Sequence, residues 1–326
     1  MEYFLVLGFV GILRESLKIF FKNRKLMAFL TLLILSFNSI FFFINVLSIK
    51  PLWSDLVLEL SLLPSTEPKT SEFFHLLAAM KEDIRSYIGL EWMFIVFSTL
   101  ASMFLATSIV IAAAVCHGGR SLLSFRKLLW ATVALQTRPF FTLLYNTVLR
   151  YGYFFLFLAN LFPFLLVVQQ MVTSKVLLST VIIILASVLY IYLNVTWNLG
   201  FVVSVLEEKS GSEAIGKAAK IIKGKRLHGF ILNLVFMILT LVIFLSDLTV
   251  KLAAANSVII GFFVTVVLGL VNILRWMAYT ILYYQCKKNH GEEVELPWSK
   301  GYSQVPIHPL LNDNEPSDHQ GEACDA

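Results

Sequence analysis

The sequence predicts an all-α fold, namely a polytopic membrane helical bundle with six transmembrane helices and cytoplasmic amphipathic interfacial helices. Of the 326 residues, 58% are hydrophobic and only 14% are charged, whereas a soluble domain carries about 25% charged residues. The mean hydropathy is +0.78. Uncharged residues form long runs, and basic residues gather in every second segment between these runs. These observations leave no room for a sizeable soluble domain.

The first 25 residues are expected to form a cytoplasmic amphipathic helix. They do not read as a signal peptide, because no basic region precedes the apolar start and no small-residue cleavage site follows it. A basic stripe and an apolar stripe fall on different helix faces, the first with Arg14, Lys18 and Lys22, the second with Phe9, Leu13, Leu17 and Phe20. Such a helix lies in the membrane interface. A simple cytoplasmic extension is the alternative.

Six uncharged runs predict a transmembrane domain over residues 26–286. Each is close to or above the roughly 18 residues that a spanning helix requires. The runs are too long and too uniformly apolar for barrel strands, which alternate over about ten residues. The predicted spans are 26–49, 92–116, 144–170, 178–206, 228–250 and 253–283.

The charges between the runs predict an orientation. Lys and Arg collect on the cytoplasmic side of a membrane. Here they precede the first run, lie between the second and third and between the fourth and fifth, and follow the sixth. Residues 50–91 instead carry seven acidic against four basic residues. We therefore expect both termini in the cytoplasm and residues 50–91 in a larger non-cytoplasmic loop. The segment 287–326 is acidic and Pro-containing, and is expected to be a disordered cytoplasmic tail.

Two further cytoplasmic segments have amphipathic helical patterns. In residues 210–223, Ser210 and Glu213 match a capping box, and an apolar face follows with Ile215, Ala218, Ala219 and Ile222. In residues 120–138, the apolar face holds Leu122, Phe125 and Leu129. Basic residues near a membrane attract anionic lipid at about 1 kcal/mol each, which makes headgroup contacts candidates at Lys217, Lys220, Lys223, Lys225 and Arg226. The alternative is that these residues only follow the positive-inside rule.

Three cysteines are present, and none belongs to a disulfide framework or a metal pattern. Cys116 and Cys286 lie at predicted cytoplasmic span ends, where palmitoylation is possible. Ordinary apolar side chains are the alternative. No short-spaced histidine pair, phosphate-binding loop or hydrolase motif occurs. We expect no enzyme activity, no cofactor or metal, and no nucleic-acid partner.

Three ionisable residues adjoin long uncharged runs and form a candidate intramembrane charge cluster: Arg150, Glu207 and Arg275. Ionisable residues inside a membrane are the default place to look for function. A structural ion pair, a pocket for a headgroup or other anion, and snorkelling to the interface are all compatible with the pattern. Amide side chains in the runs can bond between helices or line a solute path, namely Asn45, Asn160, Asn194, Asn198, Asn233, Asn256 and Asn272.

Three motifs resemble an uncharacterised family of plant multi-pass membrane proteins: Ile12-Leu13-Arg14-Glu15-Ser16, Trp197 to Glu207, and Ala214 to Arg226. Through the last two, the chain is distantly similar to the membrane domain of some bacterial glycerophosphodiester phosphodiesterases. Glu208 departs from the pattern, which has a proline there. The resemblance implies six spans in the endoplasmic reticulum or plasma membrane and brings no activity. We therefore expect a non-enzymatic protein that organises membrane lipids or protein partners. The alternative is a transporter or channel for a small solute.

Overall fold

The computed structural model describes residues 2–65, 70–118, 125–167, 172–253 and 257–291, which lie in one compact unit, Met1–Val294. This part of the chain is helical and contains no strand, so the all-α prediction is confirmed. The long helices are α2 (Arg24–Leu62), α3 (Ser71–His117), α5 (Thr137–Val167), α6 (Val172–Leu206), α8 (Arg226–Ala253) and α9 (Ser257–Asn289). The shorter elements are α1 (Glu2–Lys22), η1 (Leu63–Ser65), α4 (Phe125–Leu135) and α7 (Gly211–Ile221).

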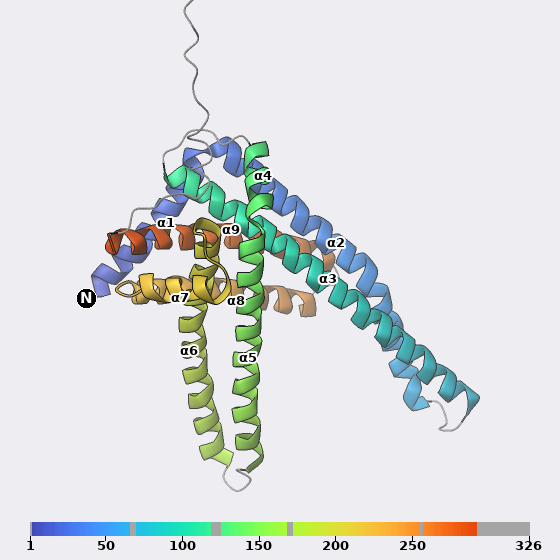
Figure 1. Cartoon of the computed structure of the whole chain (residues 1–326). Coiled ribbons are helices and arrows are strands. Elements are labelled where there is room, and N and C mark those ends of the chain that lie inside the picture. Colours follow the sequence, from blue (N-terminus) through green and yellow to red (C-terminus); the bar gives the residue numbers. More distant parts are fainter. Residues whose placement is uncertain (1, 66–69, 119–124, 168–171, 254–256, 292–326) are drawn as a thin grey trace, which may run out of the picture. The chain divides into compact units, whose positions relative to one another are not determined.

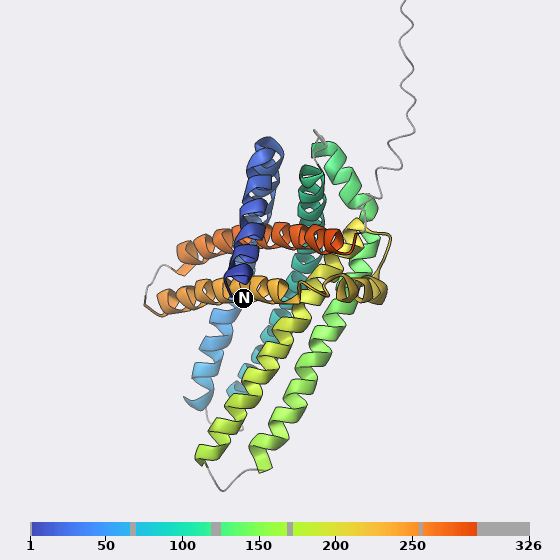
Figure 2. The ribbon, with the colours of Figure 1, turned by 90° about the vertical axis from the view of Figure 1, so that its left-hand side faces the viewer.

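The long helices pair along the chain into three hairpins, α2/α3, α5/α6 and α8/α9. The two helices of each hairpin lie side by side in both Figure 1 and Figure 2. Helix α9 also contacts α1, α2, α3, α6 and α7. It is therefore the central element on which most of the other described helices pack.

Five segments within these helices are long and apolar enough to cross a membrane: Arg24–Leu62, Ser71–His117, Leu177–Leu206, Arg226–Ser246 and Val258–Asn289. The chain is an integral membrane protein. The remaining predicted span, 144–170, coincides with α5. No segment in the described part of α5 is among these five, and the helix carries polar residues such as Asn146 and Arg150. Its role as a sixth span stays a prediction.

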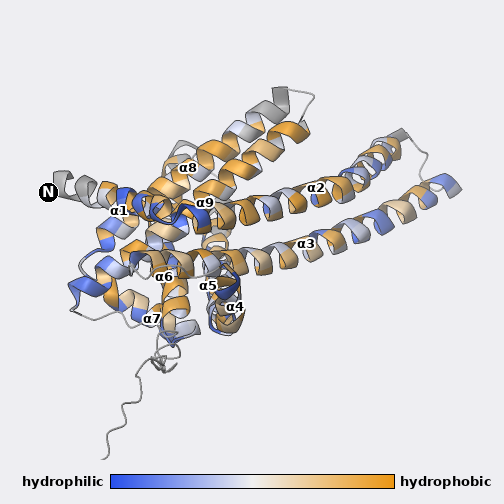
Figure 3. Ribbon diagram, turned by 90° about the horizontal axis from the view of Figure 1, so that it is seen from above, coloured by the Kyte–Doolittle hydropathy of each residue, from blue (hydrophilic) through white to orange (hydrophobic). Residues whose placement is uncertain are grey.

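The predicted loop 50–91 is not an open loop, because α2 continues to Leu62 and α3 begins at Ser71. Pro51 lies inside α2. Ring contact between Trp53 and Tyr87, with centroids 5.9 Å apart, joins the two extensions. Hydrophilic residues gather near the far end of this hairpin, while apolar residues cover most of the other long helices (Figure 3). At the other end of the chain, α9 runs to Asn289, so the predicted tail begins later than residue 287; residues 292–326 lie outside the described residues.

The core lies where α3, α6, α7 and α9 meet. Its fully buried side chains include Leu199 and Leu206 of α6 and Tyr279 and Tyr283 of α9. Close approach between α6 and α7 depends on Gly200, because a Cβ there would lie 2.9 Å from Cγ1 of Ile215. Small residues let helix backbones come together in this way.

In α1 and α4, the residues buried in the bundle lie about one position away from the predicted apolar stripes, and the interfacial placement of these stripes stays a prediction. Helix α1 packs against α3, α8 and α9 through Ile12, Ser16 and Ile19, whereas Leu17 of the predicted apolar stripe is 43% exposed. Ser16 tolerates burial because its hydroxyl donates to the Ile12 carbonyl. In α4, the buried residues are Leu128 and Thr132. Leu129 and Phe125 are half-buried, and Leu122 lies outside the described residues.

The predicted capping box of α7 does not form. The Ser210 side chain makes no capping hydrogen bond, and Glu213 instead pairs with Lys209 at 2.9 Å. The buried face holds Ala214, Ala218, Ile221 and Ile222, while Ile215 and Ala219 of the predicted face are half-buried. The small alanines face inward because α7 packs tightly on α5 and α6.

Candidate functional site

A cavity of about 790 Å³ lies between α3, α5, α6, α8 and α9, and we call it the arginine cavity. Each helix contributes polar residues at helical spacing, so that they share one face. They are Ser98 and Ser102 of α3, Asn146 and Arg150 of α5, Tyr190, Asn194 and Asn198 of α6, Asn233 and Thr240 of α8, and Asn272 and Arg275 of α9. Polar positions on five helices thus converge on one space.

The guanidinium of Arg150 is positioned by two amides one turn apart on α6. Its Nη2 donates to Oδ1 of Asn194 at 3.2 Å and to Oδ1 of Asn198 at 3.3 Å. The same amides donate onward, from Asn194 to Asn233 at 3.2 Å and from Asn198 to the hydroxyl of Tyr279 at 3.3 Å. These bonds orient both amide oxygens toward the arginine.

The hydrogen-bond network continues from these amides to the backbone of α6. The Tyr279 hydroxyl donates to Oδ1 of Asn233 at 3.0 Å, and Nδ2 of Asn233 donates to the carbonyl of Ile191 at 3.0 Å. Asn233, Asn198 and Tyr279 are nearly completely buried. A buried network of this kind fixes side-chain positions when its polar groups have hydrogen-bond partners. The network therefore holds the Arg150 guanidinium in place.

Arg275 is held separately. Its Nη2 donates to Oδ1 of Asn272 at 2.6 Å, and its guanidinium carbon lies 5.5 Å from the centroid of the Trp276 ring. A cation over an indole face is an attractive arrangement. The partners in both contacts are uncharged, and so are the hydrogen-bond partners of Arg150.

The arginine cavity therefore holds two cations without an acidic partner. Among the described residues, no Asp or Glu lines it, and neither arginine forms an ion pair. Three buried polar atoms also have no hydrogen-bond partner here: Nε of Arg150, Nε of Arg275 and Oδ1 of Asn146. Unpaired buried cations are costly. The arrangement suits an anion that accepts several charge-assisted hydrogen bonds.

The predicted cluster of Arg150, Glu207 and Arg275 does not form as a unit. The two arginines line one cavity, but Glu207 accepts from the Tyr283 hydroxyl at 2.7 Å and pairs with Lys287 at 3.4 Å and Lys217 at 3.6 Å. Glu207 instead ties the end of α6 to α7 and α9. This removes the ion pair of the arginines with Glu207 and leaves two interpretations of them, the anion pocket and snorkelling to the interface.

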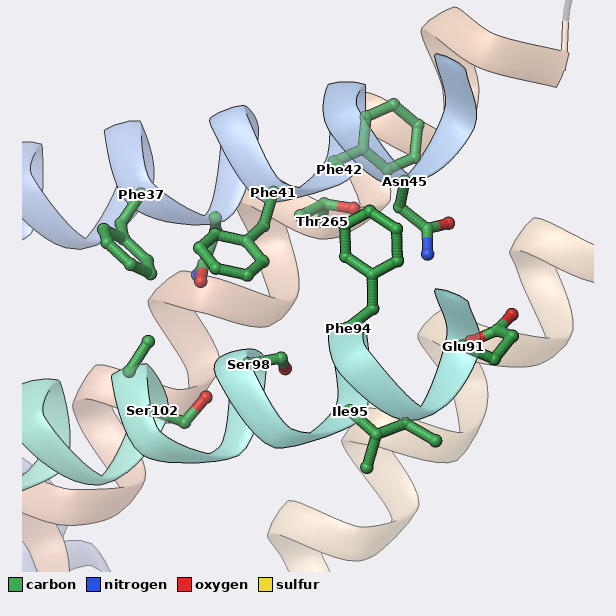
Figure 4. Close-up of a pocket in the computed structure, with 12 residues that line it drawn as sticks. Phe37, Phe41, Phe42, Asn45, Glu91, Phe94, Ile95, Ser98, Ser102 and Thr265 are labelled. Atoms are coloured by element: carbon green, nitrogen blue, oxygen red, sulfur yellow. The ribbon is translucent and has the colours of Figure 1, made fainter. Parts of the chain in front are cut away.

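A second cavity of about 350 Å³ adjoins the first, between α2, α3 and α9. Figure 4 shows Phe41 of α2 and Phe94 of α3 reaching into it, with Glu91 at one end. Ser98 and Ser102 line both cavities. The pair of hydroxyl-bearing residues on α3 is therefore a shared wall between the two spaces.

The candidate headgroup residues divide into two groups. Lys220, Lys223 and Arg226 are exposed, whereas Lys217 pairs with Glu207 and Lys225 donates to Gln285 at 3.3 Å. Only the exposed three are free to face a membrane surface. The candidate palmitoylation residues Cys116 and Cys286 are both buried, which makes acylation unfavourable because an acyltransferase needs an accessible thiol. Their burial favours ordinary apolar packing.

The predicted intramembrane amides also divide. Asn194, Asn198, Asn233 and Asn272 line the arginine cavity, and Asn45 lines the adjoining one. Asn160 bonds its own helix, and Asn256 lies outside the described residues. The sequence-based reasoning missed Asn146 and Tyr279. A usable signal existed for Asn146, which precedes Arg150 by four residues and so shares its helix face.

No group of three or more His, Cys, Asp or Glu side chains suited to a metal ion occurs in the residues that the structure describes. The arginine cavity also contains no such side chain.

Comparison with known proteins gives a family without an assigned activity. A family model described as "Domain of unknown function (DUF8558)" matches residues 1–299. No curated protein and no solved structure matches this chain. The resemblance to plant and bacterial membrane proteins stays a prediction.

Proposed function

We propose, for a chain that belongs to the DUF8558 family of unknown function, that its arginine cavity binds a phosphate-bearing anion within the membrane domain. The main observation behind this proposal is that Arg150 and Arg275 line one cavity and form hydrogen bonds only with uncharged side chains. A guanidinium presents a planar fork of donors that matches phosphate oxygens. Two such forks around one space suit an anion with several oxygens.

The free-energy cost of burying two charges favours a bound anion over a purely structural role for the arginines. A cation at the centre of a membrane helix costs about 2.5–3.5 kcal/mol even on the most lenient scale. Two arginines that merely snorkelled would need a path to the interface, yet both are held by amides within the bundle. Each Nε also lacks a partner. A bound phosphate would compensate both charges.

The test uses the purified full-length protein and two ligands that share a phosphate monoester, glycerol 3-phosphate in solution and dioleoyl phosphatidic acid in mixed micelles. Binding is measured as the rise in unfolding temperature with ligand concentration, since a ligand that binds only the folded state stabilises it. The double variant Arg150→Gln/Arg275→Gln should lose about tenfold or more in affinity, because charge-assisted hydrogen bonds disappear.

The matched control is Lys81→Gln/Arg85→Gln, which removes the same charge from exposed positions that line neither cavity. This variant should keep the affinity of the native protein. If both double variants bind the two ligands as the native protein does, or if neither ligand stabilises the native protein, the proposed anion site is wrong.

The proposal includes a six-span topology with both termini in the cytoplasm, in the endoplasmic reticulum or plasma membrane. Two polar residues of α5, Asn146 and Arg150, line the arginine cavity. This placement supports α5 as a sixth span, because polar side chains in spans face the bundle interior.

A non-enzymatic role fits the cavity best, since its lining has no Asp, Glu, His or Cys side chain. Two roles remain in this class. The polar wall of Ser98 and Ser102 that the two cavities share favours transport of the anion. The exposed Lys220, Lys223 and Arg226 favour a protein that organises anionic lipids at the cytoplasmic surface.

A further inference from the structure

The arginine cavity has a polar end and an apolar end. The polar end contains the two arginines and the asparagine network. The apolar end is formed mainly by α8, with Ile238, Leu241 and Phe244 at helical spacing, together with Leu268 of α9. Asn233 and Phe244 stand eleven residues apart on α8, which is about 16 Å at 1.5 Å per residue. The cavity is thus as amphipathic as a lipid, over a length that suits part of an acyl chain.

The apolar end is also open to the side. Ile238, Leu241 and Phe244 line the cavity, and yet they are 51%, 54% and 58% exposed. In a protein that spans a membrane, exposed apolar side chains on a long helix meet the acyl chains of the bilayer. The cavity therefore opens toward hydrocarbon along α8, a route that a lipid chain can occupy and a hydrated anion cannot.

The arginine level is well inside the helices. Asn198, which accepts from Arg150, precedes Glu207 by nine residues, or about 13 Å along α6. A phosphate at Arg150 and Arg275 would thus lie deeper than the ring of charges around Glu207. A lipid can reach that depth while its chain stays in the apolar phase.

We propose that the ligand is a membrane phospholipid with an exposed phosphate, which enters the cavity laterally from the bilayer. Its phosphate lies at Arg150 and Arg275. Its acyl chain lies along Ile238, Leu241 and Phe244. This inference rests on the proposed anion site and adds the ligand class and the route of entry. It separates a lipid from a free phosphate compound, which has the same headgroup chemistry.

The test compares dioleoyl phosphatidic acid with glycerol 3-phosphate, its soluble headgroup, on purified full-length protein in mixed micelles. The neutral-headgroup lipid dioleoyl phosphatidylcholine serves as the lipid control. The unfolding temperature should rise with phosphatidic acid, and the affinity for glycerol 3-phosphate should be about a hundredfold weaker or undetectable, because the chain contacts are missing. Phosphatidylcholine should bind about tenfold more weakly than phosphatidic acid, because its choline group adds a positive charge beside the arginines.

A matched pair on α8 tests the apolar end. Leu241 and Val242 are both 54% exposed, but only Leu241 lines the cavity. Leu241→Gln should weaken phosphatidic acid binding about tenfold, whereas Val242→Gln should leave it unchanged. Both variants place one amide at similar depth, so a shared folding defect would appear in both.

Three outcomes are informative. Equal affinity for glycerol 3-phosphate and phosphatidic acid, with Leu241→Gln and Val242→Gln alike, overturns the lipid assignment and leaves the anion site standing. Binding of both ligands that is insensitive to Arg150→Gln/Arg275→Gln overturns the anion site itself. Preferential binding of phosphatidic acid that is lost in Leu241→Gln and in the arginine variant supports both.

Discussion

Glu207 and Glu208 are neighbours in the sequence with different surroundings. The Glu207 side chain is 12% exposed and contacts Lys217 and Lys287, the latter only 9% exposed. Glu208 is 74% exposed and lies 3.9 Å from Arg138. Removing one member of a buried ion pair leaves the other charge uncompensated, whereas an exposed pair contributes little. The adjacent residues thus form a natural matched pair.

Glu207→Gln should lower the free energy of unfolding by roughly 3 kcal/mol, since Lys287 would then be buried without a counter-charge. The Tyr283 hydroxyl keeps an acceptor in the glutamine. Glu208→Gln should cost less than about 1 kcal/mol. The unfolding temperatures of both variants in detergent check this, and equal temperatures for the two would show that the buried cluster does not stabilise the bundle.

At the residue scale, the sequence predicts which charges are unusual but not which of them meet. Arg150 and Arg275 stand out because each adjoins a long uncharged run, and both line the cavity. Glu207 stands out for the same reason and lies elsewhere. Depth follows from distance along the chain, but direction depends on rotation about the helix axis. Nine residues separate Asn198 from Glu207, a rotation of about 180° at 3.6 residues per turn, so the two face opposite sides of α6.

At the scale of helices, the sequence predicts where helices form but not which of their faces are buried. Long apolar runs fix where helices must form, because the backbone needs internal hydrogen bonds in lipid. The apolar stripes predicted for α1, α4 and α7 coincide only in part with the faces that these helices bury in the bundle. The bundle instead buries Ser16, Thr132 and Ala214. Small or hydrogen-bonded side chains permit close helix contacts, and sequence periodicity alone does not report that preference.

The contact between α6 and α7 gives an element-scale prediction. Gly200→Ala places a Cβ 2.9 Å from Cγ1 and 3.2 Å from Cα of Ile215, so α7 must shift at a cost of about 1–3 kcal/mol. Gly216→Ala on α7 meets no atom within 4 Å and should be neutral or stabilising by up to about 1 kcal/mol. Unfolding temperatures in detergent compare the two. A harmless Gly200→Ala would contradict the tight packing of α7.

At the scale of the whole molecule, the length of α3 determines how the chain can sit in a membrane. Its 47 residues span about 70 Å, more than twice the roughly 30 Å of hydrocarbon. The far end of the α2/α3 hairpin, where hydrophilic residues gather (Figure 3), must therefore protrude from the membrane. In the proposed topology, this end lies on the non-cytoplasmic side.

The number of spans decides on which side of the membrane two exposed positions lie. Between Ser71 and Lys220 the chain passes through α3, α5 and α6. If α5 spans, these are three crossings and the two positions face opposite sides. If α5 does not span, only two crossings remain and both positions face the same side. Labelling these two residues therefore tests the sixth span directly.

Ser71→Cys and Lys220→Cys are made separately in a chain with Cys324→Ser, since Cys116 and Cys286 are buried. A membrane-impermeant maleimide should label Lys220→Cys in cytoplasmic-side-out vesicles and Ser71→Cys only after the vesicles are opened with detergent. Both positions are exposed, so lack of reaction in sealed vesicles reports sidedness and not burial. Labelling of both residues in sealed vesicles would reduce the topology to five spans and would leave Arg150 on a helix that does not cross the membrane. The opposite-side result would place Arg150 and Arg275 on two crossing helices, the geometry that the intramembrane phosphate site requires.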